Sequence, residues 1–165
     1  SNDLGHQGTA NAPWTNDAYM PCPEGYRVPT RAEWKSILPA SAQIPGSYTA
    51  GNGEQITATL HVANGTLVTP TGVGGTQRYV KLVSDATGNT LFIPMAGYKG
   101  DKSTSNNPDF GNWALMWTND RTGCPGGYAW LRRLRFNAAT NSLSTIDEYQ
   151  WQMEGFAYVR CVKKK

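Results

Sequence analysis

Two short polar segments in the second half of the chain carry the oxygen-bearing side chains best suited to a metal ion. They are residues 106–109, with Asn106 and Asp109, and residues 117–120, with Asn119 and Asp120. Ca²⁺ takes about six to eight oxygen ligands, and these side chains could supply part of that set. Asn and Asp also favour turns for reasons that involve no metal. The sequence therefore leaves two interpretations of these segments, a calcium site or ordinary turns.

Aromatic side chains are concentrated in the same half of the chain, where they include Trp113, Trp117, Tyr128, Trp130 and Trp151. Flat rings can stack on a sugar or anchor a protein partner. The alternative is core packing, because every second side chain of a strand points to the same face. The first candidates for ligand binding are Trp113, Trp117 and Trp130, together with Asn119 and Asp120.

Groupings typical of catalysis are hard to find. His6 and His61 lie far apart in the sequence and lack the helical spacing of a metal-binding pair. Asp147 and Glu148 are adjacent, so on a strand they would point to opposite faces and could not act as a catalytic pair. We therefore expect a protein that is not an enzyme and has no resident cofactor, apart from the Ca²⁺ left open above.

Charge and hydropathy exclude two classes of partner. The net charge of +3 equals the charge of the three C-terminal lysines at 163–165, and charged residues make up only 16% of the chain. A neutral body lacks the basic surface of a nucleic-acid-binding protein. No apolar run approaches the roughly 20 residues that span a bilayer. We expect neither a nucleic-acid partner nor direct insertion of this segment into a membrane.

One helix is predicted from local signals, over about 30–38. Thr30 and Glu33 fit a capping box, in which each side chain bonds the backbone N–H of the other residue. The apolar residues Trp34, Ile37 and Leu38 then recur at helical spacing. The sequence therefore predicts a short helix with one apolar face, which positions whatever precedes and follows it.

Strands and turns account for most of the remaining chain, which holds 18 Gly and 10 Pro. Three hairpins are predicted: 57–62 with 66–69 around the turn residues Asn64 and Gly65, 78–83 with 90–95, and 128–136 with 142–146. We also expect a long polar loop at 97–111 and a closing strand at 156–162. This pattern predicts an α+β fold with small twisted antiparallel sheets and long loops. It predicts a single domain over 1–165, with an irregular arm at 1–21 and a basic tail at 163–165.

Two segments near the ends of the chain resemble a known family. Residues 22–34 read Cys-Pro-Glu-Gly-Tyr-Arg-Val-Pro-Thr-Arg-Ala-Glu-Trp, and residues 155–162 read Gly-Phe-Ala-Tyr-Val-Arg-Cys-Val. They resemble the opening and the ending of the Fibrobacter succinogenes major paralogous (FISUMP) domain, whose usual ending is one residue shorter. The likeness extends over about 13–162. Residues 27–34 and 111–120 are also similar to segments of formylglycine-generating-enzyme-like domains.

Both resemblances imply a C-type-lectin-like fold, in which the first and last strands pair. Such pairing would bring Cys22 near Cys161, and the resemblance thus implies a disulfide between them and a free Cys124. An oxidase of the formylglycine-generating type needs a reactive cysteine pair, and the chain has no second cysteine close in sequence to Cys124 or Cys161. The resemblance therefore implies the scaffold without that chemistry.

The FISUMP resemblance also implies a secreted protein or lipoprotein at the outer surface of a Gram-negative bacterium of the Bacteroidetes type. The expected role is non-enzymatic recognition or adhesion, with a glycan or a surface protein as the partner. One alternative is a structural module of a larger surface or fimbria-like assembly, built with other domains of its parent protein, which a free Cys124 would favour. Another is a calcium-dependent sugar-binding lectin, because Asn107-Pro108-Asp109 and Trp117 to Asp120 look like loose versions of lectin motifs.

Overall fold

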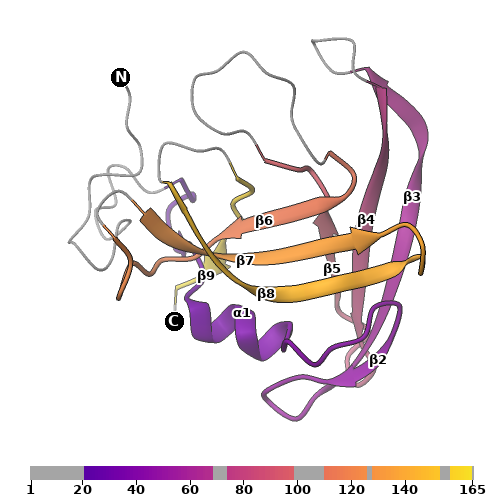
Figure 1. Ribbon diagram of the computed structural model, residues 1–165. Helices are drawn as coiled ribbons and strands as arrows, with labels where there is room; N and C mark the ends of the chain where they lie inside the picture. The colour runs from indigo at the N-terminus through magenta and orange to yellow at the C-terminus, as the bar shows by residue number, and fades with distance from the viewer. Residues whose placement is uncertain (1–20, 69–73, 99–109, 126–127, 153–156, 165) are drawn as a thin grey trace.

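The computed structural model describes residues 21–68, 74–98, 110–125, 128–152 and 157–164. Within these ranges the chain forms one helix and three antiparallel sheets (Figure 1). In chain order the elements are β1 (Tyr26–Arg27), α1 (Arg31–Ile37), β2 (Gly46–Thr49), β3 (Gln55–Val68), β4 (Gly74–Ser84), β5 (Thr90–Pro94), β6 (Trp113–Trp117), β7 (Tyr128–Asn137), β8 (Ser142–Gln152) and β9 (Val162–Lys163). The prediction of an α+β fold with small antiparallel sheets is confirmed.

Helix α1 begins where its sequence signals place it. The Thr30 side chain accepts a hydrogen bond from the Glu33 backbone N–H at 3.2 Å, and the Thr30 N–H donates to Glu33 Oε2 at 2.9 Å. Trp34 points into the core and is 1% exposed. The capping box and the helix predicted over 30–38 are therefore confirmed. Helix α1 ends at Ile37, and Leu38 is its C-cap.

The four-stranded sheet has the order β2-β3-β4-β5. The predicted hairpin between 78–83 and 90–95 is confirmed as β4 and β5, with Val83 opposite Thr90. The predicted turn at Asn64 and Gly65 is wrong, because both residues lie inside β3. There β3 continues along β4, and the pairing shifts register between Val62 and Thr66. Long pairing with β4 thus overrides a local turn signal, which survives only as an irregularity in the strand.

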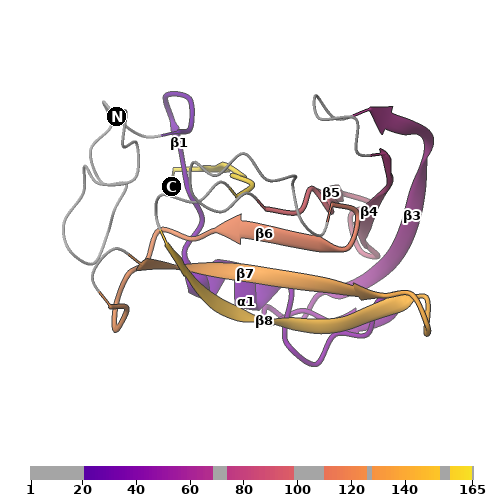
Figure 2. The same ribbon diagram turned by 45° about the horizontal axis from the view of Figure 1, so that its top comes forward.

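The three-stranded sheet has the order β6-β7-β8. Its hairpin, predicted between 128–136 and 142–146, is confirmed as β7 and β8, although β8 extends to Gln152. Strand β6 was not predicted. Figures 1 and 2 show α1 against one face of this sheet. That face shares a core with the four-stranded sheet, through residues such as Trp34, Val80, Ile93, Met116 and Leu134.

A second apolar cluster lies on the opposite face of β6-β7-β8. Its buried members are Cys22, Val28, Leu115, Trp117, Ala129 and Leu131. Both faces of the sheet therefore bury apolar side chains, and side chains that alternate along its strands enter two different environments.

The ends of the described chain meet in the smallest sheet. Strand β1 pairs with β9, with Tyr26 opposite Lys163, and a disulfide joins Cys22 to Cys161, whose Cα atoms are 5.6 Å apart. The structure thus contains the disulfide implied by the family resemblance, and Cys124 is a free thiol. Pairing continues past β9, because the N–H of Lys164 donates to the carbonyl of Gly25 at 2.8 Å.

The closing strand is shorter than the predicted 156–162. Only Val162–Lys163 forms a strand in the part of this segment that the structure describes, preceded by an isolated bridge between Tyr158 and Met116. The predicted arm at 1–21 and the polar loop at 97–111 fall mostly outside the described residues. No helix in the described ranges has the length and apolar character needed to cross a bilayer.

Candidate functional site

The segment after β6 is docked beside the start of α1. The backbone N–H and the hydroxyl of Thr118 both donate to the carbonyl of Trp130, at 3.1 and 2.9 Å. The N–H of Asn119 donates to the carbonyl of Pro29 at 2.8 Å. These bonds fix Asn119 and Asp120, two of the predicted ligand-binding residues, next to the first turn of the helix.

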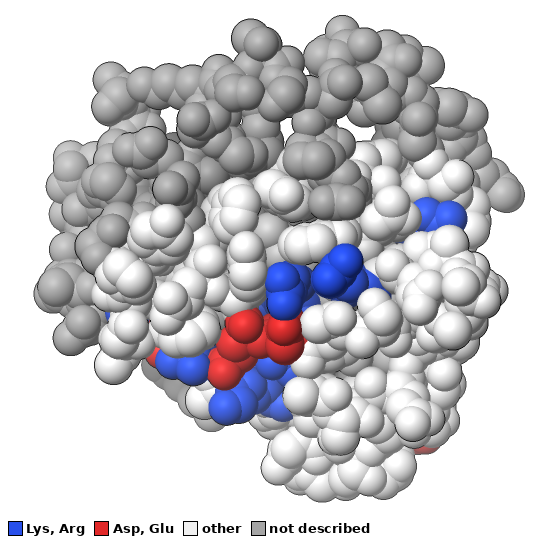
Figure 3. Space-filling view, in the orientation of Figure 1, with Lys and Arg blue, Asp and Glu red and all other residues white. Residues whose placement is uncertain are grey.

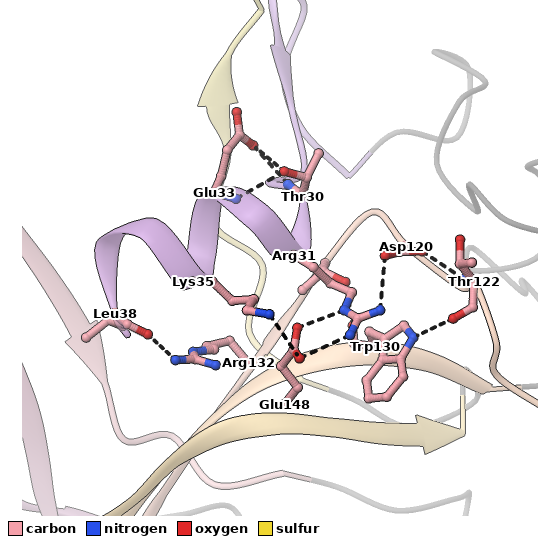
Figure 4. A network of polar contacts seen from close by, with 11 residues as sticks. Thr30, Arg31, Glu33, Lys35, Leu38, Asp120, Thr122, Trp130, Arg132 and Glu148 are labelled. Carbon is pink, nitrogen blue, oxygen red and sulfur yellow. Dashed lines mark hydrogen bonds and ion pairs between the residues drawn. The ribbon is translucent and has the colours of Figure 1, made fainter. Parts of the chain in front are cut away.

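Arg31 connects this segment to β8, as Figure 4 shows. Its Nε and Nη2 donate to the two carboxylate oxygens of Glu148 at 2.8 and 3.0 Å, a bidentate pair. Its Nη1 lies 3.5 Å from Asp120 Oδ2, and Lys35 Nζ lies 3.8 Å from Glu148 Oε2. Arg31 and Lys35 are four residues apart, so they project from the same side of α1.

Trp130 borders this network and is held in place by it. The guanidinium carbon of Arg31 lies 4.0 Å from the centroid of the Trp130 ring, a cation–π contact. The indole Nε1–H donates to the carbonyl of Thr122 at 2.8 Å, and the Thr122 N–H donates to Asp120 Oδ1 at 2.7 Å. The ring is thus fixed next to the charged groups rather than free to rotate.

These side chains surround an open hollow of about 480 Å³, here called the α1 depression. Its lining residues are Thr30, Arg31, Ala32, Lys35, Asn119, Asp120 and Glu148. Two cations and two carboxylates balance each other there, so the depression offers both donors and acceptors without a strong net charge. Figure 3 shows acidic side chains flanked by basic ones on one face, where most other described residues are uncharged. Such a lining suits a polar, multiply hydroxylated ligand.

Two ionisable groups of the depression, Arg31 and Glu148, hold each other in their charged forms. The hydrogen bonds from Arg31 lower the pKa of Glu148 and, reciprocally, those to Glu148 raise the pKa of Arg31. A carboxylate whose pKa is lowered is a poor proton donor near neutral pH, where a general acid needs a raised pKa. Glu148 is therefore poorly suited to act as a general acid.

The structure describes two of the four calcium candidates, Asn119 and Asp120. Asp120 directs one carboxylate oxygen to Arg31 and the other to the Thr122 N–H, so its charge is already balanced. Asn106 and Asp109 lie outside the described residues. Among those described, no group of three or more His, Cys, Asp or Glu side chains is arranged to hold a metal ion.

The structure does not bring the three candidate tryptophans together. Trp117 lies opposite Leu131 in the register of β6 and β7. Trp130, one residue earlier on β7, therefore points to the other face of the sheet. Trp117 is 5% exposed and belongs to the second core, so it is unavailable to a ligand. Strand alternation separates Trp113 and Trp117 from Trp130, and Trp117 takes the core position that the sequence left open as the alternative to ligand binding.

Three charged residues of the depression were not among the sequence candidates: Arg31, Lys35 and Glu148. The spacing of Arg31 and Lys35 could have shown that they share a helix face. The alternation at Asp147 and Glu148 correctly predicted that they point to opposite faces, since Asp147 pairs with Arg133 and Glu148 with Arg31. Nothing local in the sequence indicates that Glu148 faces α1, because the two segments are 117 positions apart.

A family model described as the Fibrobacter succinogenes major domain matches residues 11–163 of the chain. The match includes both resembling segments, 22–34 and 155–162. No curated protein and no solved structure matches the chain significantly.

Proposed function

The chain belongs to the Fibrobacter succinogenes major domain family, and from this premise we propose that it is a non-enzymatic recognition domain that binds a glycan at the α1 depression. The observation that carries the proposal is the lining of that hollow. Donors from Arg31 and Lys35 and acceptors from Asp120 and Glu148 line one hollow, and the ring of Trp130 lies against Arg31 beside it. Sugars combine hydroxyl groups with an apolar ring face, and this set can contact both.

The state of the cysteines supports a role without catalysis. Cys161 is bonded to Cys22, and burial, followed by the nearby charge of Asp120, raises the pKa of Cys124. Because the thiolate is the reactive form, a raised pKa makes Cys124 a poor nucleophile. The cysteine chemistry of the formylglycine-generating type therefore has no support in this chain.

The disulfide supports an extracellular location, since such bonds persist in oxidising compartments. The pairing of β1 with β9 agrees with the C-type-lectin-like fold that we propose for this domain, in which the first and last strands are neighbours. We place the protein at the outer surface of a Gram-negative bacterium, secreted or lipid-anchored, where a glycan-binding domain would serve in adhesion.

The first test is binding of the labelled chain to an array of neutral glycans, with Ca²⁺ and again with EDTA. Asp120→Asn should weaken any hit at least about tenfold, because it removes a charged hydrogen-bond partner. Asp85→Asn, in the turn between β4 and β5, is the matched control and should bind like the wild type. Equal binding by both variants, or no binding to any glycan, would overturn the proposal.

Binding measured in EDTA distinguishes the calcium-dependent alternative from metal-free binding. Loss of a hit in EDTA would identify a calcium lectin and make Asn106, Asp109, Asn119 and Asp120 the first positions for mutation. A hit that survives EDTA supports the metal-free arrangement around Arg31 and Trp130.

A second candidate function is a structural module of a larger surface or fimbria-like assembly, bound to other domains or proteins. The observation that favours it is the free, partly exposed thiol of Cys124. Non-reducing electrophoresis of the oxidised chain should then show a covalent dimer that Cys124→Ser abolishes. A chain that stays monomeric under oxidising conditions would count against this role.

A further inference from the structure

A second group of polar and aromatic side chains lies on the face of β6-β7-β8 that points away from α1. We call it the aromatic face and define it by Tyr98, Trp113, Arg133, Arg135, Asp147, Tyr149 and Trp151. Trp113 is packed against Tyr98, with ring centroids 5.5 Å apart, and Tyr98 against Trp151, at 4.9 Å. Trp151 in turn stacks on Tyr149 at 5.7 Å. None of these residues lines the α1 depression.

One of the two arginines on this face is fully engaged. Arg133 donates through Nε and Nη2 to the two oxygens of Asp147, at 2.8 and 2.6 Å. Its guanidinium carbon also lies 4.3 Å from the centroid of the Tyr149 ring. Asp147 thus neutralises Arg133, and that pair adds no net charge to the face.

Arg135 also lies against an aromatic ring, but no described carboxylate pairs with it. It is exposed, its guanidinium carbon lies 4.7 Å from the centroid of the Trp113 ring, and no described residue forms an ion pair with it. Stacking on an indole restricts the guanidinium group, which lowers the entropy lost when a ligand binds. The aromatic face therefore has an excess positive charge and a set of donors already in position.

A further donor on the same face lacks an acceptor. The indole Nε1 of Trp151 is buried and makes no hydrogen bond within the described part of the chain. Buried donors are nearly always paired in folded proteins, so each exception calls for an explanation. An acceptor supplied by a ligand would satisfy this N–H, and the rings of Tyr98 and Trp113 connect Trp151 to Arg135.

We propose that the aromatic face is a second binding site, specific for an acidic saccharide. The carboxylate of a uronic acid unit would pair with the fork of Arg135, a geometry that guanidinium groups favour. The apolar face of the sugar would lie along the rings, and a sugar oxygen would accept from Trp151. The excess positive charge selects an acidic sugar over a neutral one, in contrast to the balanced charges of the α1 depression.

The test compares two ligands of the same size by calorimetric titration. Tetragalacturonate should bind, and its fully methyl-esterified form, which lacks the negative charges, should bind at least about tenfold more weakly. Arg135→Gln should abolish this preference, whereas Lys81→Gln removes an equal charge from β4 of the other sheet and should not. Arg135→Lys keeps the charge without the planar fork of donors, and its preference for the acidic ligand should lie between those of Arg135→Gln and Lys81→Gln.

Trp151→Phe tests the unpaired donor separately. It keeps an aromatic ring, removes the N–H, and should weaken tetragalacturonate binding about threefold or more. Asp120→Asn should leave the affinity for tetragalacturonate unchanged, so the proposals for the aromatic face and for the α1 depression are tested independently. Equal affinity for the acidic and esterified ligands, or an Arg135→Gln variant that binds like the wild type, would overturn the proposal.

Discussion

Glu33 shows how much a single side chain does at the start of α1. Its carboxylate accepts from the Thr30 N–H and forms a bidentate pair with Arg27, at 2.7 and 2.6 Å. The hydrogen bonds from Arg27 are the main reason that the pKa of Glu33 falls from 4.5 to about 2. This residue therefore joins β1 to the helix that carries Arg31 and Lys35.

Glu33 should make stability depend on pH in acid. Because its pKa is lower in the folded state, its contribution is fully present above about pH 4.5 and is lost as the pH falls towards 2. With allowance for solvent screening at this partly exposed site, Glu33→Gln should lower the free energy of unfolding by about 1–2 kcal/mol at pH 7. The measurement is urea unfolding of both proteins between pH 2 and 7, and the difference should vanish near pH 2.

Glu24→Gln, at an exposed position before β1, is the control. A constant difference between wild type and Glu33→Gln across this pH range would mean that the ion pair with Arg27 contributes nothing. Gln can still serve in a capping box, so the comparison isolates the charge.

Residue types alone predicted only part of the candidate site. Asn119 and Asp120 were found because their chemistry is visible in the sequence, and both do line the depression. Glu148 was missed because its role depends on where β8 lies relative to α1. The sequence did not assign Trp113 and Trp130 to a face of the sheet, because their faces follow from the pairing register of β6 and β7.

At the scale of elements, the two larger sheets are joined at Gly111, just before β6. Its N–H donates to the carbonyl of Met95 at 2.8 Å, and its own carbonyl accepts from Arg78 Nη1 at 3.2 Å. Gly111 has a φ of +77°, and a Cβ at this position would lie 1.9 Å from the carbonyl oxygen of Thr76. The close approach of the two backbones therefore requires glycine.

Replacing Gly111 with Ala should be far more damaging than the same change at Gly123. Gly123 has a nearly equal φ of +75°, but a Cβ there meets nothing within 4 Å. Gly123→Ala should cost about 1–2 kcal/mol from backbone conformation alone. Gly111→Ala should cost at least about 2 kcal/mol more, because the backbone of β4 must move. Chemical denaturation of both variants measures the difference, and equal losses would show that the sheets separate easily at this point.

Local signals predicted the elements that local physics controls. The capping box at Thr30 and Glu33 predicted α1, and the two strand segments at 78–83 and 90–95 predicted the β4–β5 hairpin. The turn predicted at Asn64 and Gly65 was wrong because the long pairing of β3 with β4 outweighs the local turn preference of two residues. Strand β6 reads Trp-Ala-Leu-Met-Trp and is covered on both faces, so it lacks the alternation of polar and apolar residues that marks a half-buried strand.

At the scale of the whole molecule, the Cys22–Cys161 disulfide spans 139 positions of the sequence. In the chain-entropy model, a closure of this length stabilises the folded state by about 4–5 kcal/mol. The double variant Cys22→Ser/Cys161→Ser should lose about that much in denaturant unfolding, and added reductant should not destabilise it further. Cys124→Ser, which leaves the disulfide intact, should stay within about 1 kcal/mol of the wild type. A double variant as stable as Cys124→Ser would show that β1–β9 pairing alone keeps the ends together.

The same disulfide decides where mechanical load travels. A pull applied to the chain before Cys22 and after Cys161 would pass from one cysteine to the other through a covalent bond, and the sheets between them would bear almost none of it. A domain loaded in this way would thus keep the sheets between the two cysteines folded while both ends of the chain are under tension. Under reducing conditions the load would instead fall on the two-residue pairing of β1 and β9, and stretching of single molecules would then release the whole length between the cysteines.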